Sequence, residues 1–261
     1  MKTVKIVSLA FVGTFILFSC KNSEKSNLEI EVSPDKELAV IESVNPEKNA
    51  SESFLYVTAS TGLSLREYNN LQSTKLAVMP YGTKVKVITA EENPTMIIGE
   101  IEGGMDQVEY NHKKGFAFNG YLSKYFPPEK GISPKGYAEE LKVIFPKVLF
   151  TETTGGSASK PTNTETLLIP TAKWHEAFYI AQQLFEFPSK FKFPSHKGKE
   201  NEIIKNKMSK RTGWLSELHV SRQENKLIKI EYIYKTKGLS RTVIIKKEGA
   251  MMKLSNLEVV D

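Results

Sequence analysis

The 261-residue chain contains one cysteine, Cys20, four histidines and no long uninterrupted apolar run. A single cysteine excludes an intramolecular disulfide framework and a metal site built from cysteines. The four histidines, at positions 112, 175, 196 and 219, show no metal-ligand spacing. The sequence therefore predicts no metal site and no cofactor.

The first residues have the pattern of a secretory signal peptide. Lys2 and Lys5 precede an apolar region at residues 6–18, and Ser19 is a small residue directly before Cys20. This region has about a dozen residues, whereas a membrane-spanning helix needs roughly 20. If the segment is an ordinary signal peptide or an uncleaved membrane anchor, Cys20 has no special role.

The segment LFSC at residues 17–20 resembles the lipoprotein box of bacterial lipoproteins. In that family a diacylglycerol is attached to the cysteine thiol, and the chain is cut just before it. The resemblance implies that residues 1–19 are removed and that Cys20 carries the lipid. It also implies a cell-envelope protein that is anchored to a membrane and faces the periplasm or the exterior.

Residues 20–53 lack the apolar content of a folded segment. Residues 21–52 carry four basic and eight acidic groups and are rich in Ser, Asn, Glu, Lys and Pro. Such a composition buries too little surface to offset chain entropy, so a disordered tether is predicted. Roughly 30 flexible residues have an end-to-end distance on the order of 30 Å. A short strand within residues 30–41 is the alternative.

Residues 54–126 show short apolar alternations divided by turns. Several short strands within about 70 residues, without a helix, predict a small β-barrel. Pro80, Tyr81 and Gly82 form a predicted turn, because proline presets φ and glycine tolerates a positive φ. Residues 111–114 are predicted as a hairpin loop, with Gly115 opening the next strand.

Four segments of this region resemble the bacterial SH3-like (SH3b) domain. They are GLSLR at 62–66, PYGTKV at 80–85, GFAF at 115–118 and GYLS at 120–123. The chain departs from the family pattern at Asn69-Asn70, where a proline is usual, and at Met105, where a tryptophan is common. The resemblance implies an SH3-like barrel that binds rather than catalyses, with peptidoglycan or an envelope protein as its partner.

Aromatic side chains near the predicted loops are candidates to stack on such a ligand. They are Tyr68, Tyr81, Tyr110 and Tyr121. The alternative is that these rings pack the small barrel and only their phenol groups reach water.

Residues 135–261 follow a Pro- and Gly-containing hinge and predict an α+β domain. Its expected elements are a helix at 137–144, a polar loop at 151–164 and a helix capped by Thr171 and stopped by Pro188. Four strands from Trp214 onward form a predicted antiparallel meander on which the helix packs. Alternation places Ile228, Ile230, Tyr232 and Tyr234 on one face of the second strand. The fold class is thus mainly β plus α+β.

The segments FYIAQQLFEFP and KFP (192–194) resemble bacterial lipoproteins of uncharacterised function, and this likeness extends over nearly the full chain. Between Lys190 and Arg211 the chain carries eight basic and two acidic groups. Candidates for contact with an anionic surface are Lys190, Lys192, Lys197 and Lys199. A solvated loop followed by a polar helix at 202–210 is the alternative. Nucleic acid is not an expected partner, because an exported protein rarely meets it.

Catalytic motifs are lacking, so a non-enzymatic binding protein is predicted. His175-Glu176 begins a zinc motif, but Tyr179 occupies the position of the second histidine. An envelope enzyme in the α+β domain is one alternative, with Glu176, Glu186, Glu217 and His219 as its candidate groups. A small-ligand carrier with a pocket on a concave sheet is another.

Overall fold

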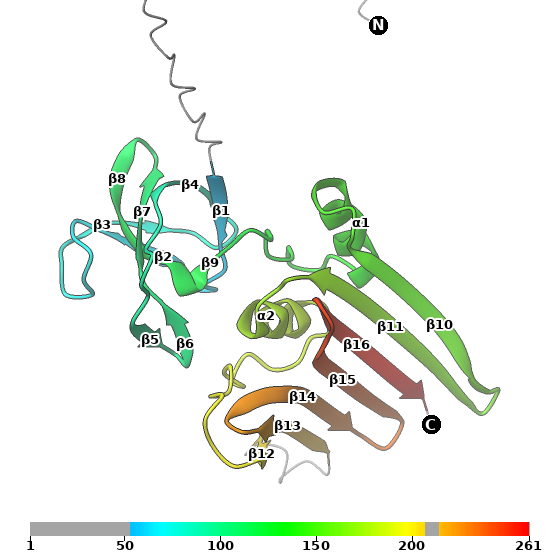
Figure 1. Ribbon diagram of the computed structural model, residues 1–261. Helices are drawn as coiled ribbons and strands as arrows, with labels where there is room; N and C mark the ends of the chain where they lie inside the picture. The colour runs from blue at the N-terminus through cyan, green and yellow to red at the C-terminus, as the bar shows by residue number, and fades with distance from the viewer. Residues whose placement is uncertain (1–52, 207–213, 261) are drawn as a thin grey trace, which may run out of the picture. The chain divides into compact units, whose positions relative to one another are not determined.

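The computed structural model describes residues 53–206 and 214–260 (Figure 1). Cys20, with the predicted signal peptide and nearly all of the predicted tether, lies outside the described residues. The same holds for three basic residues of the cationic segment, Lys207, Lys210 and Arg211. Of the helices in the described ranges, none is long and apolar enough to cross a membrane.

The first sheet is built from seven short antiparallel strands. In chain order they are β1 (Ser53–Val57), β2 (Leu63–Arg66), β3 (Lys75–Met79), β4 (Lys84–Thr89), β7 (Met105–Tyr110), β8 (Lys113–Phe118) and β9 (Leu122–Ser123). Their order in the sheet is β3-β2-β8-β7-β4-β1-β9, so β3 and β9 are edges and the sheet is not a closed barrel. The hairpin β5 (Met96–Ile98) and β6 (Ile101–Gly103) forms a separate two-stranded sheet.

Turn chemistry explains how these strands connect. Gly82 has φ +80°, and the Thr83 N–H donates to the carbonyl of Pro80 at 3.2 Å, which confirms the predicted turn. Asn111 and His112 both have positive φ, as a two-residue hairpin requires. The loop is therefore shorter than the predicted 111–114, because Lys113 already pairs with Tyr110.

Close packing at β8 explains one glycine of the SH3-like segments. A Cβ placed on Gly115 would lie 2.5 Å from the backbone oxygen of Arg66. Glycine therefore lets β8 approach β2 where the two strands pair. Met105, at the position where the family pattern has tryptophan, is buried in the core.

The second sheet is larger and also antiparallel. Its strands are β10 (Leu149–Ser157), β11 (Lys160–Pro170), β12 (Asn201–Lys205), β13 (Leu215–Gln223), β14 (Lys226–Lys235), β15 (Leu239–Glu248) and β16 (Met251–Val260). They follow the order β10-β11-β16-β15-β14-β13-β12. The predicted four-stranded meander is confirmed as β13 to β16, and further strands extend it on both sides.

Two of these extensions correct sequence predictions. The predicted polar loop at 151–164 is the hairpin of β10 and β11, which pair from Leu149↔Leu168 to Ser157↔Lys160. The segment is rich in threonine, whose branched side chain suits a strand, and β16 supplies a hydrogen-bonding partner for β11. The predicted polar helix at 202–210 is likewise wrong at its start, because Asn201–Lys205 forms β12 beside β13.

The side-chain alternation predicted for β14 does not hold for the first residues of the strand. Ile230 and Tyr232 are buried as expected, but Ile228 is exposed and Leu227 is buried instead. The pairing with β13 shifts register between Ser221 and Arg222. This irregularity changes the side-chain alternation at the start of the strand.

Two helices accompany the second sheet. The helix α1 (Pro134–Ile144) confirms the prediction, and Ser133 caps it by accepting the Gly136 N–H at 3.0 Å. The helix α2 (Trp174–Leu184) packs against β15 and β16 (Figure 1) and buries Phe178. Thr171 does not cap α2.

The start of α2 is set by other contacts. Thr171 has φ +56°, and its N–H donates to the carbonyl of Ala250 at 2.8 Å. The N-cap is Lys173, whose N–H donates to a carboxylate oxygen of Glu176 at 2.6 Å. The first helical turn is therefore fixed by a glutamate that lies inside it.

The predicted hinge is packed rather than free. Tyr125 is 1% exposed, its hydroxyl donates to the carbonyl of Pro170, and its ring centroid lies 4.6 Å from that of Phe145. Tyr137 is fully buried and donates its hydroxyl to the carbonyl of Phe126 at 2.8 Å. Residues 50–261 accordingly cluster as one compact unit.

Candidate functional site

The four tyrosines predicted to bind a ligand lie on separate segments. Tyr68 is 58% exposed in the loop between β2 and β3, and Tyr110 ends β7. Tyr121 ends the 3-10 helix η1 (Asn119–Tyr121) and packs its ring edge-on against Phe118. Tyr81 alone of the four lines a groove of substantial size.

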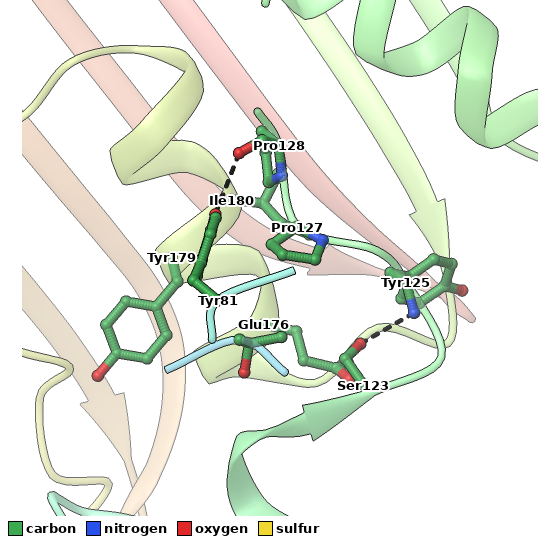
Figure 2. A pocket seen from close by; sticks show the side chains of 9 residues that line it. Tyr81, Ser123, Tyr125, Pro127, Pro128, Glu176, Tyr179 and Ile180 are labelled. Atoms are coloured by element: carbon green, nitrogen blue, oxygen red, sulfur yellow. Dashed lines mark hydrogen bonds between the residues drawn. The ribbon is translucent and has the colours of Figure 1, made fainter. Parts of the chain in front are cut away.

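Tyr81 is held in the turn between β3 and β4. Its hydroxyl donates to the carbonyl of Pro128 at 3.1 Å (Figure 2). Burial raises the pKa of Tyr81 to about 12, so the phenol stays neutral and keeps the proton that it donates to Pro128. One side of the ring is therefore fixed by the protein, while the residue as a whole stays 36% exposed.

A groove of about 670 Å³ runs beside Tyr81. Its aromatic and apolar wall consists of Tyr56, Tyr81, Phe126 and Pro127, and its polar residues are Ser60, Glu129, Lys130, Glu140 and Gln183. The rings of Tyr56 and Phe126 meet edge-on at 5.9 Å, and those of Phe126 and Tyr137 at 5.6 Å. This arrangement presents aromatic surface to an extended ligand and offers charges of both signs beside it.

Tyr81 also lines a smaller cavity, whose lining residues Figure 2 shows. It measures about 20 Å³ and is lined by Thr58, Tyr81, Ser123, Tyr125, Pro127, Pro128, Glu176, Tyr179 and Ile180. That volume holds about one water molecule and not an organic substrate. The Glu176 carboxylate, which lines this cavity, already accepts the N–H of Lys173 at the N-terminus of α2. We therefore assign this cavity no binding role.

His175 is a buried residue at the junction of the first sheet with α2. Its ring packs edge-on against the ring of Phe193. Desolvation, assisted by the positive charge of Lys173, lowers the pKa of His175 to about 4. The histidine is therefore neutral at pH 7.

The four lysines predicted to contact an anionic surface lie on the segment after α2. All four are exposed, and the ammonium group of Lys190 also donates to Asn206. Phe191 and Phe193, which stand between them in the sequence, are buried. The surface of this segment is thus cationic without exposed aromatic rings.

The buried side chain of Arg222 holds this lysine segment in one conformation. Its guanidinium donates to the carbonyls of Ser195 and Lys199 at 2.8 and 2.9 Å and pairs with Glu202 at 2.9 Å. The Arg222 side chain is only 2% exposed. The lysines are therefore presented on an anchored loop.

The groups named for the enzyme alternative are only partly brought together. Glu217 lies 3.0 Å from His219 and 3.1 Å from Lys205, and the hydrogen bond from His219 is the main reason why its pKa is lowered. Glu176 lies in the first turn of α2, and Glu186 follows the end of that helix. In the described part of the chain no group of three metal-ligating side chains could hold an ion.

Sequence reasoning missed the other walls of the groove and a polar cluster on the second sheet. Tyr56 and Phe126 line the groove with Tyr81. The Pro127-Pro128 pair directly after Phe126 is a sequence feature that could have indicated a rigid segment there. Glu165, Arg241 and Asn256 meet at a second cavity although they are far apart in sequence. No motif connects them.

Comparison with protein-family models, with curated proteins and with solved structures finds no match for this chain. The site is therefore interpreted from its own geometry.

The buried His175 makes the stability of the protein depend on pH. An unfolded histidine has a pKa near 6.5, whereas the folded value is about 4. Folding therefore favours the neutral ring, and its stabilisation is present above pH 6.5 and lost as the pH falls toward 4. Urea unfolding should show a loss of up to about 1.4 kcal/mol per pH unit in that interval.

The variant His175→Gln should lose this part of the pH dependence, and His112→Asn, at an exposed turn, should retain it. Equal pH dependence in the wild type and in His175→Gln would contradict the assignment.

Proposed function

We propose that this protein is a membrane-anchored lipoprotein of the bacterial cell envelope whose first sheet is a non-catalytic, SH3-like binding module that recognises peptidoglycan. The observation that carries the proposal is the groove beside Tyr81. Its wall of Tyr56, Tyr81 and Phe126 suits the faces of sugar rings and the backbone of short peptides. Its mixed charges suit a polymer that bears both carboxylate and amino groups.

The placement of the SH3-like segments supports the module assignment. Residues 62–66 include β2, residues 80–85 make the turn into β4, and residues 115–118 lie in β8. Residues 120–123 lead through η1 into β9, which pairs with β1. Segments that are distant in the chain thus contribute to one sheet.

The exposed lysines support a location close to an anionic surface. Residues 128–261 carry 23 basic and 15 acidic groups, and Lys192, Lys197 and Lys199 lie on the loop that Arg222 anchors. We propose that this loop contributes a salt-sensitive attraction to acidic lipid or wall polymer. Specific recognition is assigned to the groove.

Binding to isolated peptidoglycan sacculi tests the groove. The detergent-solubilised full-length protein should co-sediment with sacculi, and Tyr81→Ala should weaken binding about tenfold, because a stacking ring and its apolar surface are lost. Tyr81→Phe should retain most of the affinity. Tyr68→Ala is the matched control, since Tyr68 is exposed outside the groove.

Two outcomes would contradict this proposal. One is a protein that stays in the soluble fraction at every salt concentration. The other is a larger loss of binding for Tyr68→Ala than for Tyr81→Ala. If the protein instead bound a single envelope protein and not sacculi, the ligand of the groove would be that protein and not peptidoglycan.

The lipid anchor is tested separately at Cys20. Mass spectrometry of the mature N-terminus should show a chain that begins at Cys20 with a thioether-linked diacylglycerol, because two acyl chains give stable anchoring. Cys20→Ser should release the protein from membranes. An intact apolar segment in front of an unmodified Cys20 would overturn the anchor.

A further inference from the structure

The second sheet carries a cavity of about 150 Å³ beside the C-terminal end of α2. Polar side chains of β11, β15 and β16 form its floor, and the helix end forms its apolar side. The floor residues are Asn163, Glu165, Arg241, Asn256 and Glu258, and the helix contributes Leu184 and Phe185. This cavity is distinct from the groove beside Tyr81.

Two buried acceptors at this cavity have no hydrogen-bond donor. Asn256 is 6% exposed, and its Nδ2 donates to Glu165 at 3.2 Å, which leaves Oδ1 without a partner. Asn163 donates its Nδ2 to Glu152 at 2.9 Å, and its buried Oδ1 likewise has no partner. Each amide nitrogen is bound by a carboxylate, so each oxygen is left as an unsatisfied acceptor in a residue that lines the cavity.

The charges at the cavity favour a cation. Arg241 donates from Nε and Nη2 to Glu258 at 3.1 and 2.8 Å and from Nη1 to the carbonyl of Phe185 at 3.2 Å. The guanidinium is thereby occupied by partners within the protein. Among the residues that the structure describes, Glu165 forms no ion pair, and burial is the main reason why its pKa is raised.

The shape and the apolar side limit the class of cation. A cavity of about 150 Å³ accommodates a molecule the size of benzene, which means about six non-hydrogen atoms. Leu184 and Phe185 offer contact to methylene groups rather than to a hydrated metal ion. The site therefore suits a short carbon chain that ends in a charged amine.

We propose that this cavity binds an alkylammonium group. Its ammonium donates to Oδ1 of Asn163 and of Asn256 and pairs with the carboxylate of Glu165. Its methylene groups lie against Leu184 and Phe185. The same chemistry is found in a free short diamine and in a lysine-type side chain of a peptide. This binding is independent of the groove beside Tyr81.

Isothermal titration of the detergent-solubilised full-length protein tests the proposal. The probes are putrescine, Nα-acetyl-lysine amide and, as a neutral isostere, 1,4-butanediol. We expect saturable binding of at least one amine and none of the diol. The amine that binds more tightly identifies the source of the ligand. Absence of heat with both amines, or equal binding of the diol, would show that the cavity holds only water.

Two matched variants locate the binding. Glu165→Gln preserves the size of the side chain and should weaken amine binding about tenfold or more, because the charged partner is lost. Glu248→Gln removes a carboxylate of the same sheet that does not line the cavity, and affinity should change less than about twofold. Equal affinities of Glu165→Gln and the wild type would overturn the assignment.

A third variant separates binding from folding. Asn256→Leu removes the acceptor that has no partner together with the amide that donates to Glu165, so we expect loss of amine binding with a folded protein whose midpoint of thermal unfolding is only modestly lower. Retained amine binding in this folded variant would contradict the role of Asn256.

Discussion

Burial of two tyrosine rings, Tyr125 and Tyr137, is the constraint on which the rest of the structure depends. Both rings are removed from water, and each hydroxyl donates to a backbone carbonyl, of Pro170 and of Phe126. A buried phenol without a partner would be costly, so these bonds fix the rings in one position. The connecting residues 126–133 are consequently held between the first sheet and α1.

The proposed binding groove follows from this constraint. Phe126 meets both Tyr56 and Tyr137 edge-on, and Pro128 accepts the hydroxyl of Tyr81. Residues of β1, of the β3–β4 turn and of the connecting segment therefore share one wall. If the connecting segment were free, the aromatic wall beside Tyr81 would not be assembled.

Local patterns predicted the elements well where one face is apolar. The four strands from Trp214 and the helix that begins at Pro134 were recognisable because their apolar positions repeat with periods of two and of about three to four. The hairpin of β10 and β11 was missed because nearly all of its side chains from Thr151 to Ser157 are exposed. Its second strand, β11, pairs with distant residues of β16, which no local pattern reveals.

The candidate sites were less predictable for the same reason. Tyr81 was recognised as a candidate from its place in a turn, but its partners Tyr56 and Phe126 lie 25 and 45 residues away in the sequence. The acceptors Asn163 and Asn256 come near one another only through the register of β11 and β16, in which Asn163 is opposite Glu258 and Asn256 is opposite Glu165. Chemistry that depends on such long-range register requires the structure.

Differential scanning calorimetry of the full-length protein tests most directly whether the buried tyrosines unite the two sheets. We expect a single transition whose calorimetric and van't Hoff enthalpies agree, and Tyr125→Ala should shift the whole transition to lower temperature. Two separate transitions in the wild type, of which Tyr125→Ala shifts only one, would contradict the account.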